Sequence, residues 1–280
     1  MVYFSIITVN KNNAQGLEKT IESVIKQTYS DIEFIIIDGK SEDESVAKIK
    51  QHEDRIFFWI SEEDTGIYNA MNKGIRKASG KYCLFLNSGD YLYDNNILKE
   101  IVDLNYEEDI ISGNVIKYSE SHYNEEPFSK IKHSTISLFD LYSNSLNHQA
   151  TFISRDLFNK YGFYEEKYAV ISDWIFMLKT LILNNVTYKY INKTISFYSE
   201  GGISNGKTNY FIEERIPALK ELFPARILTD YENNFNKDFL LIYNRLKKYK
   251  RCNFILRSLN YLVIKYENIF KQSKNRNENL

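Results

Sequence analysis

Hydrophobic residues in the first hundred positions follow two alternating periods. Four short apolar runs, rich in Val, Ile and Phe, are typical of buried strands. They span residues 4–9, 32–38, 56–60 and 82–86. Between these runs apolar residues recur every three or four positions, as in Leu17, Ile21 and Val24, which indicates amphipathic helices. Strands alternating with helices predict an α/β fold with a mainly parallel, Rossmann-like sheet covered on both faces.

Two further helices are predicted in this part of the chain. Ser41 followed by Glu44 has the spacing of a capping box, and Val46 and Ile49 come after it. The other helix carries a single apolar stripe. The stripe consists of Ile67, Ala70, Met71, Gly74, Ile75 and Ala78.

The pattern is looser after residue 105. Strands are predicted at 109–118, 186–191 and 194–199, and a short strand ending near 154 leads into a helix at 155–161. Asp173 stands at the start of another helix. The apolar face of that helix contains Trp174, Met177, Leu178 and Leu181. We therefore predict two halves of one domain, 1–105 and 106–230, and a C-terminal helical extension, 231–280.

Polar side chains follow three of the predicted strands. Asn10 and Lys11 end the first, Asp38 ends the second, and the turn from Asn87 to Asp90 ends the fourth. In parallel α/β sheets ligands bind at the carboxyl ends of the strands, which predicts a binding site on this rim. Asp, Asn and Ser are also ordinary turn and N-cap residues, so each alone has a structural explanation as well.

Composition and motifs exclude several functional classes. A net charge of −1 gives no general signal for nucleic acid. The two cysteines and four histidines show no zinc spacing. The glycine-rich dinucleotide and P-loop motifs and the G-x-S-x-G elbow are missing. The N-terminus has no signal-peptide pattern, and no window is long and apolar enough to cross a bilayer, so the predicted location is cytoplasmic.

Three ordered blocks carry a resemblance to a known family. They are "SIITVNKNNAQGLEKTIESVIKQTYSDIEFIIIDGKSEDES", "EEDTGIYNAMNKGIRKASGKYCLFLNSGDYL" and "NHQATFISRDLF…GFYEEKYAVISDWIFMLK". Together they resemble the inverting family-two glycosyltransferases of the GT-A fold, in the branch that builds bacterial exopolysaccharide, capsule and O-antigen. The resemblance covers roughly residues 1–205.

The resemblance implies transfer of a sugar from a nucleotide-sugar donor to a hydroxyl of a saccharide acceptor. A divalent cation, Mn²⁺ or Mg²⁺, would stabilise the departing diphosphate, and a carboxylate would deprotonate the acceptor. Asp38 matches the position that hydrogen-bonds the nucleobase, and Asp64 matches a second acidic donor-site position. Val9, Asn10 and Lys11 would border the base, with Lys11 where the family often has Tyr.

The turn Asn87-Ser88-Gly89-Asp90 matches the metal-binding DxD region of the family. Many members have Asp-x-Asp-Asp there, so two carboxylates are missing. The resemblance assigns Asp90 to the metal and Asn87 to the ribose or diphosphate. With fewer carboxylates, phosphate oxygens and water would complete the coordination.

In the second half, Asp173 matches the catalytic base of the family. A helix N-terminus favours an ionised carboxylate, although Asp is also a common helix cap. His148 and Gln149, in "NHQATF", together with Trp174, are assigned to the donor sugar or the acceptor. Lys73 is expected to be a solvated surface residue, with a phosphate contact as the alternative. Gly201 and Gly202 are expected to form a mobile loop over the site, or else a plain turn.

The segment from Lys237 to Arg276 has eleven basic residues and two acidic ones, with aromatic and aliphatic residues at helical spacings. One interpretation is docking on an anionic inner leaflet of the plasma membrane, which would bring the site to a lipid-linked acceptor. The other is a helical pair that packs on the domain and leaves its basic face in solvent. The sequence leaves both open.

Two other functions stay open at this point. A catalytically inactive, glycosyltransferase-like nucleotide-binding scaffold would explain the reduced DxD region, whereas the presence of Asp38, Asp90 and Asp173 together argues against it. A sugar nucleotidyltransferase would need a glycine-rich, arginine-containing loop after the first strand, and "NKNNAQGLEK" lacks one.

Overall fold

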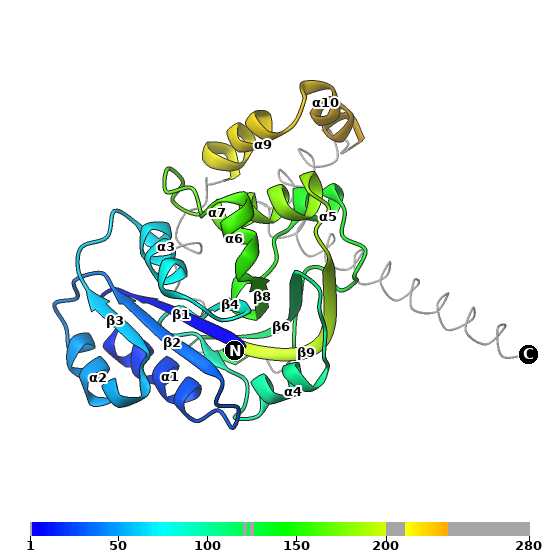
Figure 1. Ribbon diagram of the computed structural model, residues 1–280. Coiled ribbons are helices and arrows are strands. Elements are labelled where there is room, and N and C mark those ends of the chain that lie inside the picture. Colours follow the sequence, from blue (N-terminus) through cyan, green and yellow to red (C-terminus); the bar gives the residue numbers. More distant parts are fainter. Residues whose placement is uncertain (1, 120–121, 124–125, 200–210, 235–280) are drawn as a thin grey trace, which may run out of the picture. The chain divides into compact units, whose positions relative to one another are not determined.

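The computed structural model describes residues 2–119, 122–123, 126–199 and 211–234 (Figure 1). The strands are β1 (Phe4–Asn10), β2 (Ile32–Asp38), β3 (Phe58–Ser61), β4 (Tyr82–Phe85), β5 (Tyr91–Leu92), β6 (Ile110–Ser119), β7 (His122–Tyr123), β8 (Thr151–Ser154) and β9 (Tyr188–Ser199). The α-helices are α1 (Ala14–Ile25), α2 (Ser45–Gln51), α3 (Ile67–Lys77), α4 (Ile97–Asp103), α5 (Leu138–Ser143), α6 (Arg155–Tyr161), α7 (Ser172–Met177), α9 (Ile216–Leu222) and α10 (Ala225–Asn234). The 3₁₀ turns are η1 (Glu53–Arg55) and η2 (His148–Ala150), and the π-helical turns are η3 (Leu178–Leu183) and η4 (Phe211–Arg215).

One sheet runs through both predicted halves in the order β3-β2-β1-β4-β8-β6-β9-β5, and β7 pairs with β6. The first four strands are parallel, as the alternation of strands and helices predicts. β8 runs antiparallel between β4 and β6, and β5 runs antiparallel to β9. The sheet is therefore parallel in its first half and mixed in its second.

Both faces of the first strands are buried, which explains their unbroken apolar runs. On one face, Phe4 and Ile6 of β1 join Leu17 and Ile21 of α1 in the main core cluster. Figure 1 shows α1 and α2 on one side of β1–β3 and α3 on the other. The alternation of side chains along a strand sends Ile7 to the α3 side.

Helix α3 lies unusually close to β1. A Cβ atom added at Gly74 would be 2.4 Å from Cγ2 of Ile7, closer than any real contact. Glycine at this position therefore lets the helix approach the sheet. Ala70, Met71, Gly74 and Ile75 are buried on the same helix, which confirms most of the predicted stripe, and Tyr68 is buried as well.

Two predictions of local structure were wrong. Ser41 does not cap α2, because that helix begins at Ser45 with Glu44 at its N-cap, and the Ser41 side chain is engaged with Asp38 instead. The strands predicted at 186–191 and 194–199 are one strand, β9, because Asn192 and Lys193 continue the extended backbone without a turn.

The chain divides into two compact units, Met1–Ala218 and Leu219–Leu280. In the second unit the described residues form the end of α9 and α10. The basic segment from Lys237 to Arg276 and the Gly201-Gly202 pair lie outside the described residues. In the described part of the chain, none of the helices is long and apolar enough to cross a membrane.

Candidate functional site

Polar groups gather where β2, β1 and β4 end side by side. Asn10 and Asp38 are paired in the register of β1 and β2. The turn after β4 is held against β1, since the Ser88 amide donates to the Val9 carbonyl over 3.1 Å. The structure thus brings Asn10, Asp38 and the turn Asn87–Asp90 to one rim, at the point where the strand order reverses around β1.

Asp38 is fully buried and accepts hydrogen bonds from four donors. They are Asn10 Nδ2 at 2.7 Å, Ser41 N at 2.9 Å, Ser41 Oγ at 2.5 Å and Ser61 Oγ at 2.6 Å. A carboxylate offers about four lone-pair sites, so the protein itself fills them. Oδ1 of Asn10 is buried and has no hydrogen-bond partner within the described residues. Asp38 therefore holds the Asn10 amide in place, with the Asn10 Oδ1 left unpaired in the described part of the chain.

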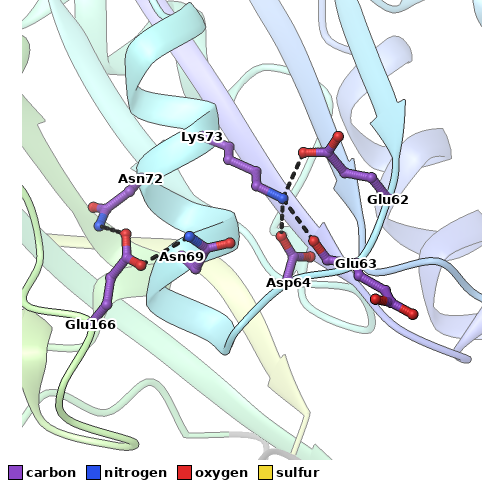
Figure 2. A network of polar contacts seen from close by, with 7 residues as sticks. All are labelled: Glu62, Glu63, Asp64, Asn69, Asn72, Lys73 and Glu166. Carbon is purple, nitrogen blue, oxygen red and sulfur yellow. Dashed lines mark hydrogen bonds and ion pairs between the residues drawn. The ribbon is translucent and has the colours of Figure 1, made fainter.

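Asp64 lies next to this rim, in the loop between β3 and α3. Its Oδ2 would be 3.2 Å from a Cβ added at Gly39, just beyond the end of β2. Its Oδ1 is 2.7 Å from Nζ of Lys73, which also lies 2.6 Å from Oε1 of Glu62 and donates to the Glu63 carbonyl (Figure 2). Lys73 is therefore not a freely solvated residue, because it forms ion pairs with two carboxylates of the acidic loop.

The turn after β4 buries Asp90. Gly89 has φ +102°, a conformation that glycine adopts without strain, and the Asp90 side chain is 5 % exposed. Its Oδ1 accepts the Ser199 amide at 2.9 Å. Burial raises the pKa of Asp90 to about 6, although the Ser199 amide and the nearby His148 act in the opposite direction.

His148 connects this turn to Asp173. Its Nδ1 lies 3.4 Å from Oδ2 of Asp173, and its Nε2 lies 3.2 Å from Nδ2 of Asn87. Burial lowers the pKa of His148, but the hydrogen bond and charge of Asp173 and the charge of Asp90 outweigh it and raise the pKa. A protonated ring donates from both nitrogens. Oδ1 of Asn87 is buried without a partner in the described region, and it accepts the hydrogen bond from Nε2–H when the Asn87 side-chain amide is rotated to face the ring.

Asp173 lies in the first turn of α7. Its Oδ1 accepts a hydrogen bond of 2.8 Å from the Tyr68 hydroxyl. Burial acts to raise the pKa of Asp173, but the hydrogen bond and charge of His148, the Tyr68 hydroxyl and the Trp174 amide outweigh it, and the pKa is lowered. The carboxylate is therefore held ionised, as a general base requires.

The remaining predicted site residues occupy different surroundings. Gln149 is buried and bonds to Asp90, whereas Lys11 is exposed beyond the end of β1. Trp174 is 2 % exposed, donates from Nε1 to the Leu141 carbonyl at 2.7 Å and packs beneath the Arg215 guanidinium. The burial of Trp174 weighs against its contact with a sugar. The assignment of Trp174 to the donor sugar or the acceptor stays a prediction.

A metal ion would find few protein ligands here. The described residues contain no group of three or more His, Cys, Asp or Glu side chains arranged to hold one. Asp90 supplies a single carboxylate on the turn, a donor set that suits Mg²⁺ or Mn²⁺ only where phosphate oxygens and water complete the coordination. The residues therefore fit a cation that arrives with a diphosphate.

Sequence reasoning missed several residues that support the site. On α3, the Tyr68 hydroxyl bonds to Asp173, and Asn69 and Asn72 both bond to Glu166. Ser41 and Ser61 bond to Asp38. Their partners are 23 to 105 positions away except for Ser41, so no local pattern reveals the contacts.

Comparisons with known proteins identify the family. The family described as Glycosyl transferase family 2 matches residues 5–162. The PGL/p-HBAD biosynthesis glycosyltransferase of Mycobacterium bovis (strain BCG / Pasteur 1173P2) is 30% identical over 227 residues, which are 78% of this chain and 86% of that protein.

Two solved structures share the fold. Staphylococcus aureus TarS 1-349 in complex with UDP-GlcNAc has a TM-score of 0.60 and 16% identity, over 71% of this chain and 59% of that one. The mannosyltransferase PcManGT from Pyrobaculum calidifontis, in complex with GDP-Man and Mn²⁺, has a TM-score of 0.54 and 15% identity, over 70% and 56%. This chain thus spans less than two thirds of the length of either.

These matches confirm the predicted α/β fold of the GT-A type. Because the family match covers more than half of the chain and the relative is similar over most of both sequences, the chain belongs to glycosyl transferase family 2.

Proposed function

We propose that this glycosyltransferase moves a hexosyl group from a nucleotide-sugar donor to a hydroxyl of a saccharide acceptor, with inversion, in surface polysaccharide biosynthesis. The observation that carries the proposal is the pair formed by Asp173 and His148, which joins an ionised carboxylate to the donor-side turn at Asn87. A base and a diphosphate-binding turn in this proximity suit a single displacement at the anomeric carbon.

In this reaction the acceptor oxygen bonds to the anomeric carbon as the bond from that carbon to the diphosphate oxygen breaks. Asp173 accepts the proton from the acceptor hydroxyl. Attack opposite the leaving group inverts the anomeric configuration. His148 lies between the base and Asn87, and a positive charge on its ring would stabilise the negative charge that develops on the diphosphate.

Asp90 is the residue that would hold a divalent cation. Such an ion would supply Lewis-acid stabilisation of the diphosphate. The similarity to a structure containing GDP-Man and Mn²⁺ supports this kind of cofactor, and the TarS complex with UDP-GlcNAc supports a nucleotide sugar as substrate.

The function is tested by incubating the protein with UDP-, GDP- and dTDP-sugars, with and without Mn²⁺, and measuring release of nucleoside diphosphate. Turnover of one donor supports the transferase. Binding of a donor without turnover, in the presence of a range of saccharide acceptors, would instead support the inactive nucleotide-binding scaffold. The observation in favour of that alternative is the single carboxylate, Asp90, on the turn that would hold the metal.

We expect Asp38→Ala and Asp90→Ala to weaken binding of different ligands. Asp38→Ala releases the Asn10 amide and should weaken binding of the free nucleoside, because the base end of the site loses its fixed acceptor. Asp90→Ala should weaken only the Mn²⁺-dependent binding of the nucleoside diphosphate. Calorimetry with both ligands, with and without Mn²⁺, measures the difference, and equal losses for both ligands in both variants would contradict the assignment.

We also propose that the acceptor is lipid-linked and that the basic segment between Lys237 and Arg276 docks on an anionic cytoplasmic leaflet. Eleven basic residues against two acidic ones support this, since each basic residue near such a surface contributes about 1 kcal/mol. Sedimentation with anionic and neutral vesicles should show preferential binding of the full chain to anionic vesicles at low salt. A chain ending at Tyr231 should lose that preference, and equal binding by both chains would reject docking.

A further inference from the structure

Four polar side chains of helix α3 contact other segments of the site. They are Tyr68, Asn69, Asn72 and Lys73, which form two pairs spaced four residues apart. Figure 2 shows Lys73 reaching the acidic loop at Asp64, and Asn69 and Asn72 reaching Glu166. One rigid element therefore bonds both to the donor-side loop and to the segment that leads into α7.

Asn72 fixes that segment to α3. It is 1 % exposed, its Oδ1 accepts the Tyr164 amide at 3.0 Å, and its Nδ2 donates to the Tyr164 carbonyl and to Oε1 of Glu166, both at 2.9 Å. Asn69 donates to the other oxygen of Glu166 at 2.9 Å. The hydrogen bond from Asn72 is the main cause that lowers the pKa of Glu166, so this anchor stays an anion. The backbone approaching Asp173 is thus held at two successive points.

Tyr68 completes the connection at Asp173 itself. Its ring is buried against the Tyr164 ring, with centroids 5.5 Å apart, and its hydroxyl donates to Oδ1 of Asp173 at 2.8 Å. Burial raises the pKa of Tyr68 well above its usual value, so the hydroxyl remains a donor at any working pH. The other titratable groups facing Asp173 are His148 on Oδ2 and the Tyr164 ring, while Asp90 acts on His148.

We propose that Tyr68 is a positioning residue for Asp173, and that α3, held by Asn69, Asn72 and Lys73, sets the place of this carboxylate relative to the donor side of the site. The proposal rests on the proposed function, in which Asp173 is the base. Tyr68 contacts the carboxylate of the base, and its role is to fix the rotation of that carboxylate. His148 holds Oδ2 only at 3.4 Å, so the shorter bond from Tyr68 determines the orientation.

Tyr68→Phe removes only the hydroxyl and tests the proposal. We expect kcat to fall about tenfold or more, because a base displaced by a fraction of an ångström loses its alignment, while KM for the donor changes by less than about twofold. Loss of a donor to the carboxylate raises the pKa of Asp173, so the acid limb of the kcat profile should move up by about one pH unit.

Tyr82→Phe is the matched control. It also removes one hydroxyl from a buried ring, but that hydroxyl donates to the Glu108 carbonyl at 2.8 Å, at the end of β4 away from the site. We expect Tyr82→Phe to keep the wild-type kcat and acid limb. Thermal unfolding and calorimetric donor binding of both variants show that each is folded and that any loss of kcat in Tyr68→Phe is not a loss of structure.

Three outcomes separate the possibilities. Unchanged kcat and an unmoved acid limb in Tyr68→Phe, with Asp173→Asn inactive, would overturn the positioning role and leave the proposed function intact. Equal losses in Tyr68→Phe and Tyr82→Phe would also overturn it, because they would reflect the loss of any buried hydroxyl and not the loss of the bond to Asp173. Full transfer by Asp173→Asn would remove the base itself, and the proposed mechanism would fail together with the role of Tyr68.

Discussion

We expect Asp173→Asn to lower the transfer rate by a factor of about 10²–10⁴, while binding of the nucleoside diphosphate stays nearly unchanged. An amide cannot accept the proton of the acceptor hydroxyl, but it keeps the shape of the carboxylate and can still accept the hydrogen bond from Tyr68. Donor binding survives because the groups on the rim, Asn10 and the turn Asn87–Asp90, are untouched. Single-turnover kinetics with the donor identified in the screen, combined with calorimetry, measures both quantities.

Asp140→Asn provides the control for this experiment. Asp140 is also a carboxylate at the start of a helix, in a capping box with Ser137 at α5, but none of its hydrogen bonds involves the site. The control should keep the wild-type transfer rate. Near-normal transfer by Asp173→Asn would show that Asp173 serves α7 as a structural residue and that the base lies elsewhere.

Glu33→Ala should lower the free energy of unfolding by about 3 kcal/mol, because hydrogen bonds to a buried charged group are worth about 1.5–3 kcal/mol each. Glu33 lies near the start of β2, on the rim opposite the site, and is 3 % exposed. Its carboxylate accepts from Ser5 Oγ at 2.7 Å, from the Ser79 amide at 2.8 Å and from the Ser79 hydroxyl. It thereby joins β1, β2 and the turn that precedes β4.

The effect of Glu33 should depend on pH. Burial acts to raise the pKa of Glu33, but the hydrogen bonds from Ser79 and Ser5 outweigh it, and the pKa lies below its value of 4.5 in the unfolded chain. A lowered pKa means that the stabilisation is complete above the unfolded-state pKa and is lost as the pH falls through the folded-state pKa. The difference between wild type and Glu33→Ala should therefore be largest at neutral pH and shrink in acid.

Urea unfolding at pH 7 and at acid pH measures this difference. Glu22→Ala is the control, since the Glu22 side chain is half-exposed and its ion pair among the described residues is with Lys26 on the same helix, and such pairs contribute less than about 1 kcal/mol. A difference between Glu33→Ala and wild type that does not change with pH would contradict the assignment of the effect to the charge.

The sequence predicts the elements whose signal is local. β1, β2, β4 and α3 follow from hydrophobic periodicity, and the rim at Asn10, Asp38 and Asn87 follows from the rule that parallel strands end on the same side. The antiparallel insertion of β8 between β4 and β6 has no such signal, because pairing partners far apart in sequence leave no local period.

The chemistry of the site is less predictable for the same reason. Asp173 can be suspected from the start of its helix, but the bond from Tyr68 joins residues 105 positions apart. Lys73 looks like a surface lysine in its helix and becomes an ion-pair partner only when the acidic loop folds over it. The burial of Trp174 likewise depends on Leu141 and Arg215, from two other segments.

The interleaved sheet has a thermodynamic consequence for this enzyme. β4 of the first half pairs with β8 of the second, and β5 pairs with β9, so neither half has a complete set of strand partners alone. The rim at Asn10 and Asp38 and the segment that carries Asp173 therefore belong to one cooperative folding unit. A substitution that destabilises the second half, residues 106–230, lowers the fraction of molecules able to bind donor, even when it lies far from the nucleotide. Apparent donor affinity in such variants reports global stability as well as contact with the ligand.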